Sequence, residues 1–106
     1  MKIAIIGYGK MGRTIEKIAK KENIEVVCIV DKNIQEGDLS KADVSINFSV
    51  PSAAVENILK SFECKVPVVC GTTGWLDNFD LVRNYCEKKE TAFIYSSNFS
   101  FAVNIF

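Results

Sequence analysis

The sequence predicts an α/β domain, built as a doubly wound parallel sheet with helices on both faces. Short apolar, β-branched runs alternate along the chain with segments whose apolar residues recur at helical spacing. Right-handed crossovers between such runs distribute the helices over both faces of the sheet. At 106 residues, the chain is expected to form one domain that folds without metals or disulfides.

The first predicted unit is a strand, an amphipathic helix and a second strand. Residues 2–6 form a β-branched run, and residues 25–30 form a second run that ends at Asp31. Between these runs, apolar side chains recur at helical spacing, at Met11, Ile15, Ile18 and Ala19. We therefore expect the two strands to pair in parallel.

The remaining elements continue this alternation. Residues 32–42 are polar and are expected to form a loop or a short helical turn, whereas strands are expected at residues 44–48, 66–70 and 91–95. A second helix is expected to begin at Pro51, with its apolar stripe at Ala54, Val55, Ile58, Leu59 and Phe62. The third helix has its stripe at Leu76, Phe79, Val82, Tyr85 and Cys86.

Residues 96–106 are rich in apolar side chains and lack a cap or a charge that would end the segment. Natural domain ends are usually polar, so we expect an element that continues past residue 106. The alternative is a terminal segment that docks on its own sheet.

Charge and residue content exclude several classes of protein. Lys plus Arg and Asp plus Glu both number 13, and this balance disfavours nucleic acid or an anionic membrane as a partner. The apolar runs are far shorter than the ~20 residues of a membrane span, and a signal-peptide pattern is lacking, so we expect a cytoplasmic protein. The chain has 0 histidines, which removes the commonest general base and metal ligand. The four cysteines lack Cys-x-x-Cys spacing, which favours reduced thiols over a disulfide framework or a metal site.

A glycine motif follows the first predicted strand and opens the first predicted helix. Residues 7–12 read Gly-Tyr-Gly-Lys-Met-Gly, the G-x-G-x-x-G pattern of Rossmann-type dinucleotide-binding domains. In this context Gly7 allows a tight turn, Gly9 lets a pyrophosphate approach the backbone, and Gly12 lets the helix pack close to the strand. Asp31 ends the second strand about 20 residues further on, where a carboxylate accepts the ribose hydroxyls. Lys32 could pair with a 2′-phosphate, so NADH and NADPH both stay open as cofactors.

Unusual polar segments also follow three later strands. They are Asn47-Phe48-Ser49, Gly71-Thr72-Thr73-Gly74 and Ser97-Asn98-Phe99-Ser100. All three lie at carboxyl ends of predicted strands, where open parallel sheets bind ligands. Gly71 and Gly74 permit a close backbone approach, and the threonine hydroxyls could hold a carboxamide such as that of nicotinamide.

In order and spacing, these segments resemble 4-hydroxy-tetrahydrodipicolinate reductase, the dihydrodipicolinate reductase family of lysine and diaminopimelate biosynthesis. The resemblance spans the whole chain and rests on residues 6–12, on Asn47-Phe48-Ser49 with Pro51, on the Gly-Thr-Thr-Gly loop, and on residues 96–100. It implies an oxidoreductase that transfers hydride from NADH or NADPH to a cyclic dicarboxylate.

The resemblance also implies a role for each site residue. Those expected to cradle the pyrophosphate are Gly7, Tyr8, Gly9, Lys10, Met11 and Gly12. Asp31 and Lys32 would hold the adenosine ribose, and Phe48 and Ser49 would line the cofactor groove. The residues expected to border the nicotinamide are Gly71, Thr72, Thr73, Ser96, Ser97, Asn98 and Phe99.

Two departures from the family bear on domain organisation. Ala102 stands where the family usually has glycine. The family's second domain, with a His-His-x-x-Lys-type substrate motif and a tetramer-forming sheet, has no counterpart here. Residues 1–106 are therefore expected to be the dinucleotide-binding domain alone, inactive by itself and without catalytic residues, from an enzyme that is a homo-oligomer.

Two other functions stay open at this point. A freestanding NAD(H)-binding sensor would use the same glycine motif without catalysis. Another oxidoreductase with the same first domain, such as homoserine dehydrogenase, is a weaker alternative.

Overall fold

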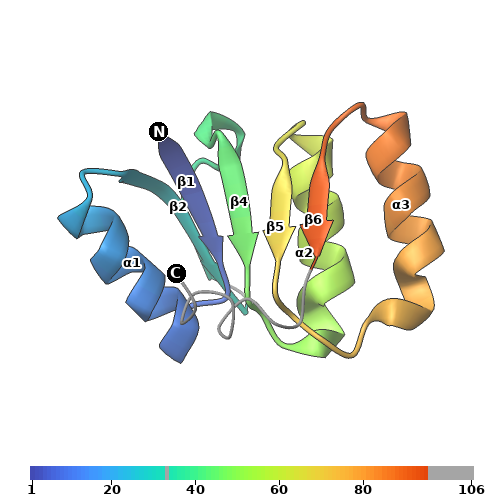
Figure 1. Cartoon of the computed structure of the whole chain (residues 1–106), viewed down its shortest axis with the longest axis horizontal. Helices are drawn as coiled ribbons and strands as arrows, with labels where there is room; N and C mark the ends of the chain where they lie inside the picture. The colour runs from blue at the N-terminus through green and yellow to red at the C-terminus, as the bar shows by residue number, and fades with distance from the viewer. Residues whose placement is uncertain (33, 96–106) are drawn as a thin grey trace.

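The computed structural model describes residues 1–32 and 34–95, and within them six strands form one sheet in the order β3-β2-β1-β4-β5-β6 (Figure 1). The strands are β1 (Lys2–Ile6), β2 (Glu25–Asp31), β3 (Ile34–Gly37), β4 (Val44–Asn47), β5 (Val68–Cys70) and β6 (Phe93–Tyr95). The helices are α1 (Lys10–Lys21), α2 (Pro51–Glu63) and α3 (Phe79–Lys88), with short 3-10 turns η1 (Leu39–Lys41) and η2 (Leu76–Asn78). This is the Rossmann-type α/β architecture that the sequence predicts.

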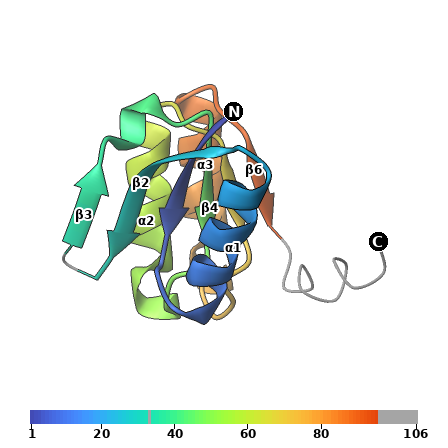
Figure 2. The ribbon, with the colours of Figure 1, turned by 90° about the vertical axis from the view of Figure 1, so that its left-hand side faces the viewer.

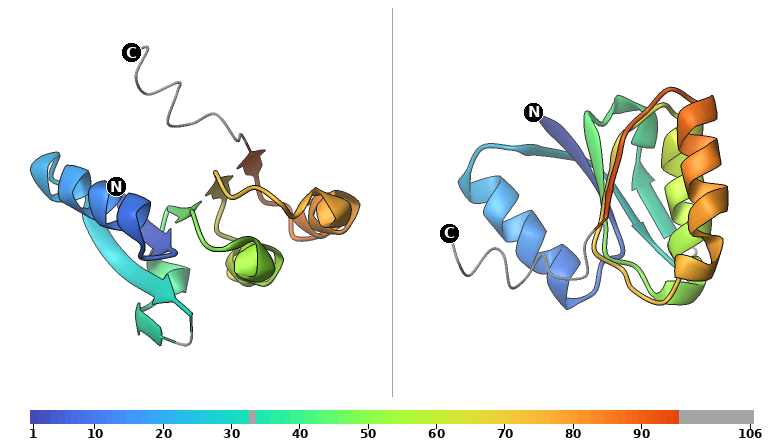
Figure 3. Two further views of the ribbon diagram at one scale, coloured as in Figure 1. Left: turned by 90° about the horizontal axis from the view of Figure 1, so that it is seen from below. Right: turned by 45° about the vertical axis from the view of Figure 1, so that its right-hand side comes forward.

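The helices cover opposite faces of the sheet. Helix α1 packs on β1 and β2, while α2 packs on β4 and β5 and contacts α3 on the other face (Figures 2 and 3). Strands β1, β2, β4, β5 and β6 pair in parallel, so their carboxyl ends share one edge of the sheet. The loops after these strands therefore gather at that edge.

The core consists of apolar clusters on the two faces of the sheet. Side chains of β1 alternate between them, as the pleat of a strand requires. Ile3 and Ile5 pack with Ala19 of α1, and Ala4 and Ile6 pack with Leu39 of η1. A third cluster, between α2, α3 and the sheet, comprises Ala54, Ile58, Phe62, Val68, Cys70, Trp75 and Val82.

The prediction of a loop or helical turn at residues 32–42 is wrong in part, because β3 is a strand that pairs antiparallel with β2. The sheet is therefore mixed, with one antiparallel strand at its edge. Gly37 makes the pairing possible: it has φ +89°, and a Cβ there would lie 2.0 Å from the carbonyl oxygen of Val27. Gln35 and Glu36 are exposed on this edge strand, which explains why the segment lacks an apolar pattern.

Some predicted helix faces also differ from those observed. Ile18 is 54% exposed and Met11 37% exposed, so α1 contacts the sheet mainly through Ile15 and Ala19. Helix α3 begins at Phe79 rather than at Leu76, and Leu76 is exposed. The neighbouring Trp75 takes the buried position instead, at 2% exposure.

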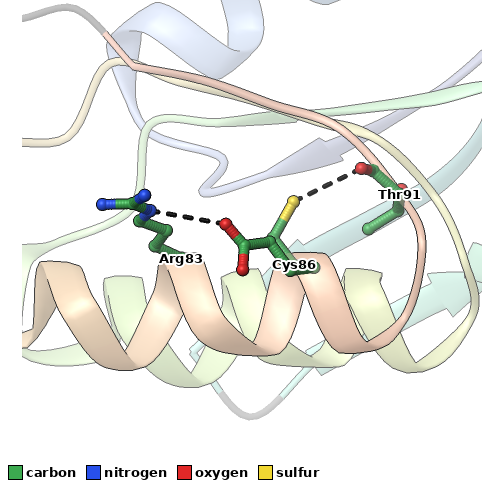
Figure 4. Close-up of polar contacts among 4 residues, drawn as sticks. Arg83, Cys86 and Thr91 are labelled. Carbon is green, nitrogen blue, oxygen red and sulfur yellow. Dashed lines mark hydrogen bonds and ion pairs between the residues drawn. The ribbon is translucent and has the colours of Figure 1, made fainter.

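The cysteines differ in burial, and all four are free thiols. Cys28 and Cys70 are buried, and burial raises the pKa of both thiols. Cys86 near the end of α3 donates from Sγ to the carbonyl oxygen of Thr91 at 3.4 Å, close to an exposed ion pair between Arg83 and Glu87 (Figure 4). Cys64 is exposed.

Within residues 1–32 and 34–95, the helices are all too short or too polar to cross a membrane. The expectations for residues 96–106 lie outside the described residues.

Candidate functional site

The turn between β1 and α1 depends on two of its three glycines for packing. Gly7 has φ +92°, and a Cβ there would lie 2.7 Å from the backbone of Phe48 and Ser49. A Cβ on Gly12 would lie 2.2 Å from the carbonyl oxygen of Gly7, so this glycine lets α1 start directly against the turn. These contacts leave room only for hydrogen at both positions.

Gly9 differs from the other two glycines. A Cβ at Gly9 would meet nothing within 4 Å among the described residues. Gly9 is the N-cap of α1, and no described side chain caps the helix there. The first N–H groups of α1 and the positive end of the helix dipole lie at this uncapped turn, which suits an anion.

A groove of about 280 Å³ adjoins this turn. We call it the central groove. It is lined by Gly7, Tyr8, Gly9, Val30, Asp31, Lys32, Phe48, Ser49, Val50, Ala53 and Asn57. These residues come from the ends of β1, β2 and β4 and from the first turns of α2, so the groove spans the carboxyl edge of the sheet.

The turn after β4 is held by the buried side chain of Asn47. Asn47 Oδ1 accepts from the backbone N–H of Ser49 at 3.0 Å and from Ser49 Oγ at 2.6 Å. Asn47 Nδ2 donates to the carbonyl oxygen of Ala54 in α2 at 3.4 Å. A fully buried asparagine with these partners fixes the β4 turn against α2, and so fixes one wall of the groove.

The loop after β5 forms a second hollow of about 230 Å³, the loop pocket, which shares a wall with the central groove. It is lined by Phe48, Ser49, Pro51, Gly71, Thr72 and Thr73. Phe48 and Ser49 line both hollows, so the two lie next to each other at this edge of the sheet.

Gly71 and the two threonines of this loop have different surroundings. A Cβ on Gly71 would lie 2.1 Å from the ring of Phe48, so glycine here accommodates that ring. Thr72 is only 6% exposed, and its hydroxyl donates to the carbonyl oxygen of Ser49 at 2.9 Å. Thr73 is exposed and lines the loop pocket. The Thr72 hydroxyl thus ties two loops together, and Thr73 is the threonine that a ligand can reach.

Trp75 anchors this loop in the core. Its indole N–H donates to the carbonyl oxygen of Thr72 at 2.6 Å, and its ring stacks on Phe79 and meets Phe93 and Tyr95 edge-on. Sequence patterns give little indication of this role, because Trp75 lies in a loop.

Replacing Trp75 with phenylalanine tests the anchor. Trp75→Phe removes the indole donor to the buried Thr72 carbonyl, which then keeps only the 3.9 Å contact from Cys70 Sγ, and it leaves a cavity. We therefore expect the free energy of unfolding to fall by roughly 2 to 3 kcal/mol. Urea unfolding monitored by circular dichroism measures the loss. Phe79→Leu is the matched control, since it removes an aromatic contact of Trp75 but keeps the N–H donor. An equal or larger loss in the control would contradict the role of the hydrogen bond.

A third hollow of about 220 Å³ lies between α1 and β3 and is called the acidic pocket. It is lined by Tyr8, Glu16, Ile29, Asp31 and Glu36. The Tyr8 hydroxyl donates to Glu16 Oε1 at 2.5 Å, and this hydrogen bond, together with burial and the negative charge of Glu16, raises the pKa of Tyr8. Tyr8 and Asp31 line both this pocket and the central groove.

The structure brings together most of the residues predicted from the sequence, but not all of them. Lys10 and Met11 are exposed in the first turn of α1 and do not line the central groove, and Gly12 is buried against the turn and does not line it either. Ser96, Ser97, Asn98 and Phe99 lie outside the described residues. Four further residues that line the central groove were not predicted from the sequence, namely Val30, Val50, Ala53 and Asn57. The helical spacing of Ala53 and Asn57 near the start of α2 could have indicated these two.

Comparison with known proteins identifies similar sequences and folds. The family described as dihydrodipicolinate reductase, N-terminus, matches residues 1–99. The chain is 50% identical to the 4-hydroxy-tetrahydrodipicolinate reductase of Christiangramia forsetii and 34% identical to that of Methanobrevibacter smithii, with 100% of this chain aligned in both cases. It spans 45% and 50% of the length of these relatives.

Solved structures share the fold at low sequence identity. A probable dehydrogenase from Thermotoga maritima superposes with a TM-score of 0.77 at 16% identity, covering 98% of this chain and 38% of that one. This likeness confirms the predicted fold class.

Proposed function

Because the chain belongs to the dihydrodipicolinate reductase family, whose N-terminal part it matches, we propose that it binds NADH or NADPH along the carboxyl edge of its sheet. The pyrophosphate rests on the turn at Gly9, the adenosine ribose lies at Asp31 in the central groove, and the nicotinamide lies toward the loop pocket. When bound, the cofactor supplies a hydride.

The observation that carries this proposal is the space in front of Gly9. Gly7 and Gly12 are explained by contacts within the protein, whereas Gly9 faces open space at the N-terminus of α1. A protein that needed the turn only for its own packing would gain nothing from glycine there, since the backbone at Gly9 has φ −84°. Close approach of a pyrophosphate to the backbone would require glycine at this position.

Different residues of the chain are proposed to bind different parts of the cofactor. Backbone N–H groups of α1 donate hydrogen bonds to the pyrophosphate, and the Asp31 carboxylate accepts hydrogen bonds from the ribose hydroxyls. Asn47 and Trp75 contribute by fixing the β4 and β5 loops, which hold the cofactor in one orientation.

We propose further that the whole enzyme reduces a cyclic dicarboxylate, as the name of the relatives indicates, and that it acts as a cytoplasmic homo-oligomer. Residues 1–106 are its dinucleotide-binding domain, and the residues that bind the substrate carboxylates lie outside them. The relatives at up to 50% identity are reductases, which favours this function over a sensor without catalysis.

Fluorescence titration of Trp75 with NADH and with NADPH tests cofactor binding. The Trp75 indole N–H donates to the carbonyl oxygen of Thr72, which lines the loop pocket. Energy transfer from the indole to a reduced nicotinamide bound there is therefore expected to be strong. Saturable quenching with micromolar affinity is the expected result. A folded protein that shows no quenching with either cofactor would contradict the proposal.

A further inference from the structure

The acidic pocket lies beside the proposed position of the adenosine ribose. Asp31 belongs to both the pocket and the central groove, so a group carried by the ribose at Asp31 lies next to the pocket. NADH and NADPH differ at this place alone: NADPH carries a phosphate where NADH has the 2′-hydroxyl. The pocket is therefore positioned to distinguish them.

Three carboxylates from different elements converge there. Glu16 comes from α1, Asp31 from the end of β2, and Glu36 from the edge strand β3, where it pairs with Ile29. Among the described residues, no lysine or arginine lines the acidic pocket. A dianionic phosphate placed beside these side chains meets like charge on several sides.

Two cations near these carboxylates in the chain sequence, Arg13 and Lys32, do not line the acidic pocket. Lys32 lines the central groove rather than the acidic pocket, and its side chain is exposed. The guanidinium of Arg13 lies over the Tyr8 ring, 5.1 Å from its centre. The Tyr8 hydroxyl is already committed to Glu16. The pocket thus presents oxygen acceptors to a ligand and few free donors.

We propose that Asp31, Glu16 and Glu36 act together to select NADH over NADPH. This inference rests on the proposed function. Asp31 accepts a hydrogen bond from the 2′-hydroxyl of NADH, and this donor is missing in NADPH. Glu16 and Glu36 add repulsion against the 2′-phosphate, so selection does not depend on Asp31 alone. Glu36 is the residue whose change isolates this repulsion, because it is exposed on an edge strand and does not line the central groove.

Calorimetric titration with NADH and with NADPH at low ionic strength tests the selection. The wild-type protein is expected to bind NADH at least about tenfold more tightly than NADPH. In Glu36→Lys, the dissociation constant for NADPH should fall by about tenfold or more while that for NADH changes little. Glu36→Gln should shift the ratio in the same direction by a smaller factor, and it replaces the lysine variant if that variant does not fold.

The matched control is Glu25→Lys, which makes the same charge change at the opposite end of β2, next to Lys2 in the register. It should leave the ratio of the two constants unchanged. Equal or tighter binding of NADPH by the wild type would overturn the inference, as would an equal shift of the ratio in both lysine variants. Failure of both cofactors to bind would instead overturn the proposed function and the inference with it.

Discussion

Replacing Gly9 with valine is expected to weaken cofactor binding by roughly a hundredfold while leaving the protein folded. A Cβ at this position meets no described atom within 4 Å in the free protein, so the valine side chain enters the space in which the pyrophosphate is proposed to rest. Keeping the pyrophosphate away from the helix N-terminus removes hydrogen bonds to a charged group, each of which contributes ~1.5–3 kcal/mol. Calorimetric titration with NADH measures the loss, and thermal unfolding measures the stability.

The matched change at the same turn is Gly9→Ala, whose smaller side chain should weaken binding less. A Gly9→Val protein that binds as tightly as the wild type would show that the pyrophosphate does not lie at this turn. A variant that unfolds would show that Gly9 has a packing role, contrary to the open space in front of it.

Replacing Gly12 with alanine is expected to have the opposite outcome, a large loss of stability. A Cβ there would lie 2.2 Å from the carbonyl oxygen of Gly7. Because this oxygen belongs to the backbone, the overlap is relieved only if α1 moves away from the turn. Overpacking of this kind costs about 1 to 3 kcal/mol and occasionally more, and only part is offset by the helix propensity of alanine. We expect the melting temperature to fall by about 10 °C or more.

Differential scanning calorimetry of Gly12→Ala and Gly9→Ala checks this expectation, since the two proteins carry the same chemical change three residues apart. A smaller melting-temperature loss in Gly12→Ala than in Gly9→Ala would contradict the packing argument. The two variants also separate the packing role of Gly12 from the proposed binding role of Gly9, because a binding measurement alone would show a loss in both cases.

Sequence patterns predict those parts of the fold that bury an apolar face. Strand β1 is a continuous apolar run because it is buried on both faces, and helix α2 has a clear helical periodicity because its apolar stripe contacts the core. The fold class follows from these elements, and so does the gathering of loops at one sheet edge. The positions of Gly7, Asp31, Ser49 and Thr73 around neighbouring hollows follow from that topology.

What the sequence does not predict depends on partners distant along the chain. Strand β3 is polar because it lies at an edge, and its pairing depends on Gly37 fitting against Val27. Trp75 is buried by contacts with β6 and α3 rather than by any local periodicity. Gly71 likewise depends on a distant partner, because a side chain there would overlap the ring of Phe48.

A chemical-shift map of the backbone amides during titration with NADH locates the cofactor on the protein. We expect the largest shifts at Gly9, Asp31 and Ser49, smaller shifts at Thr73, and none on the exposed face of α3 around Arg83. Shifts confined to α3, or a folded protein whose amides do not respond to NADH, would contradict this location of the cofactor.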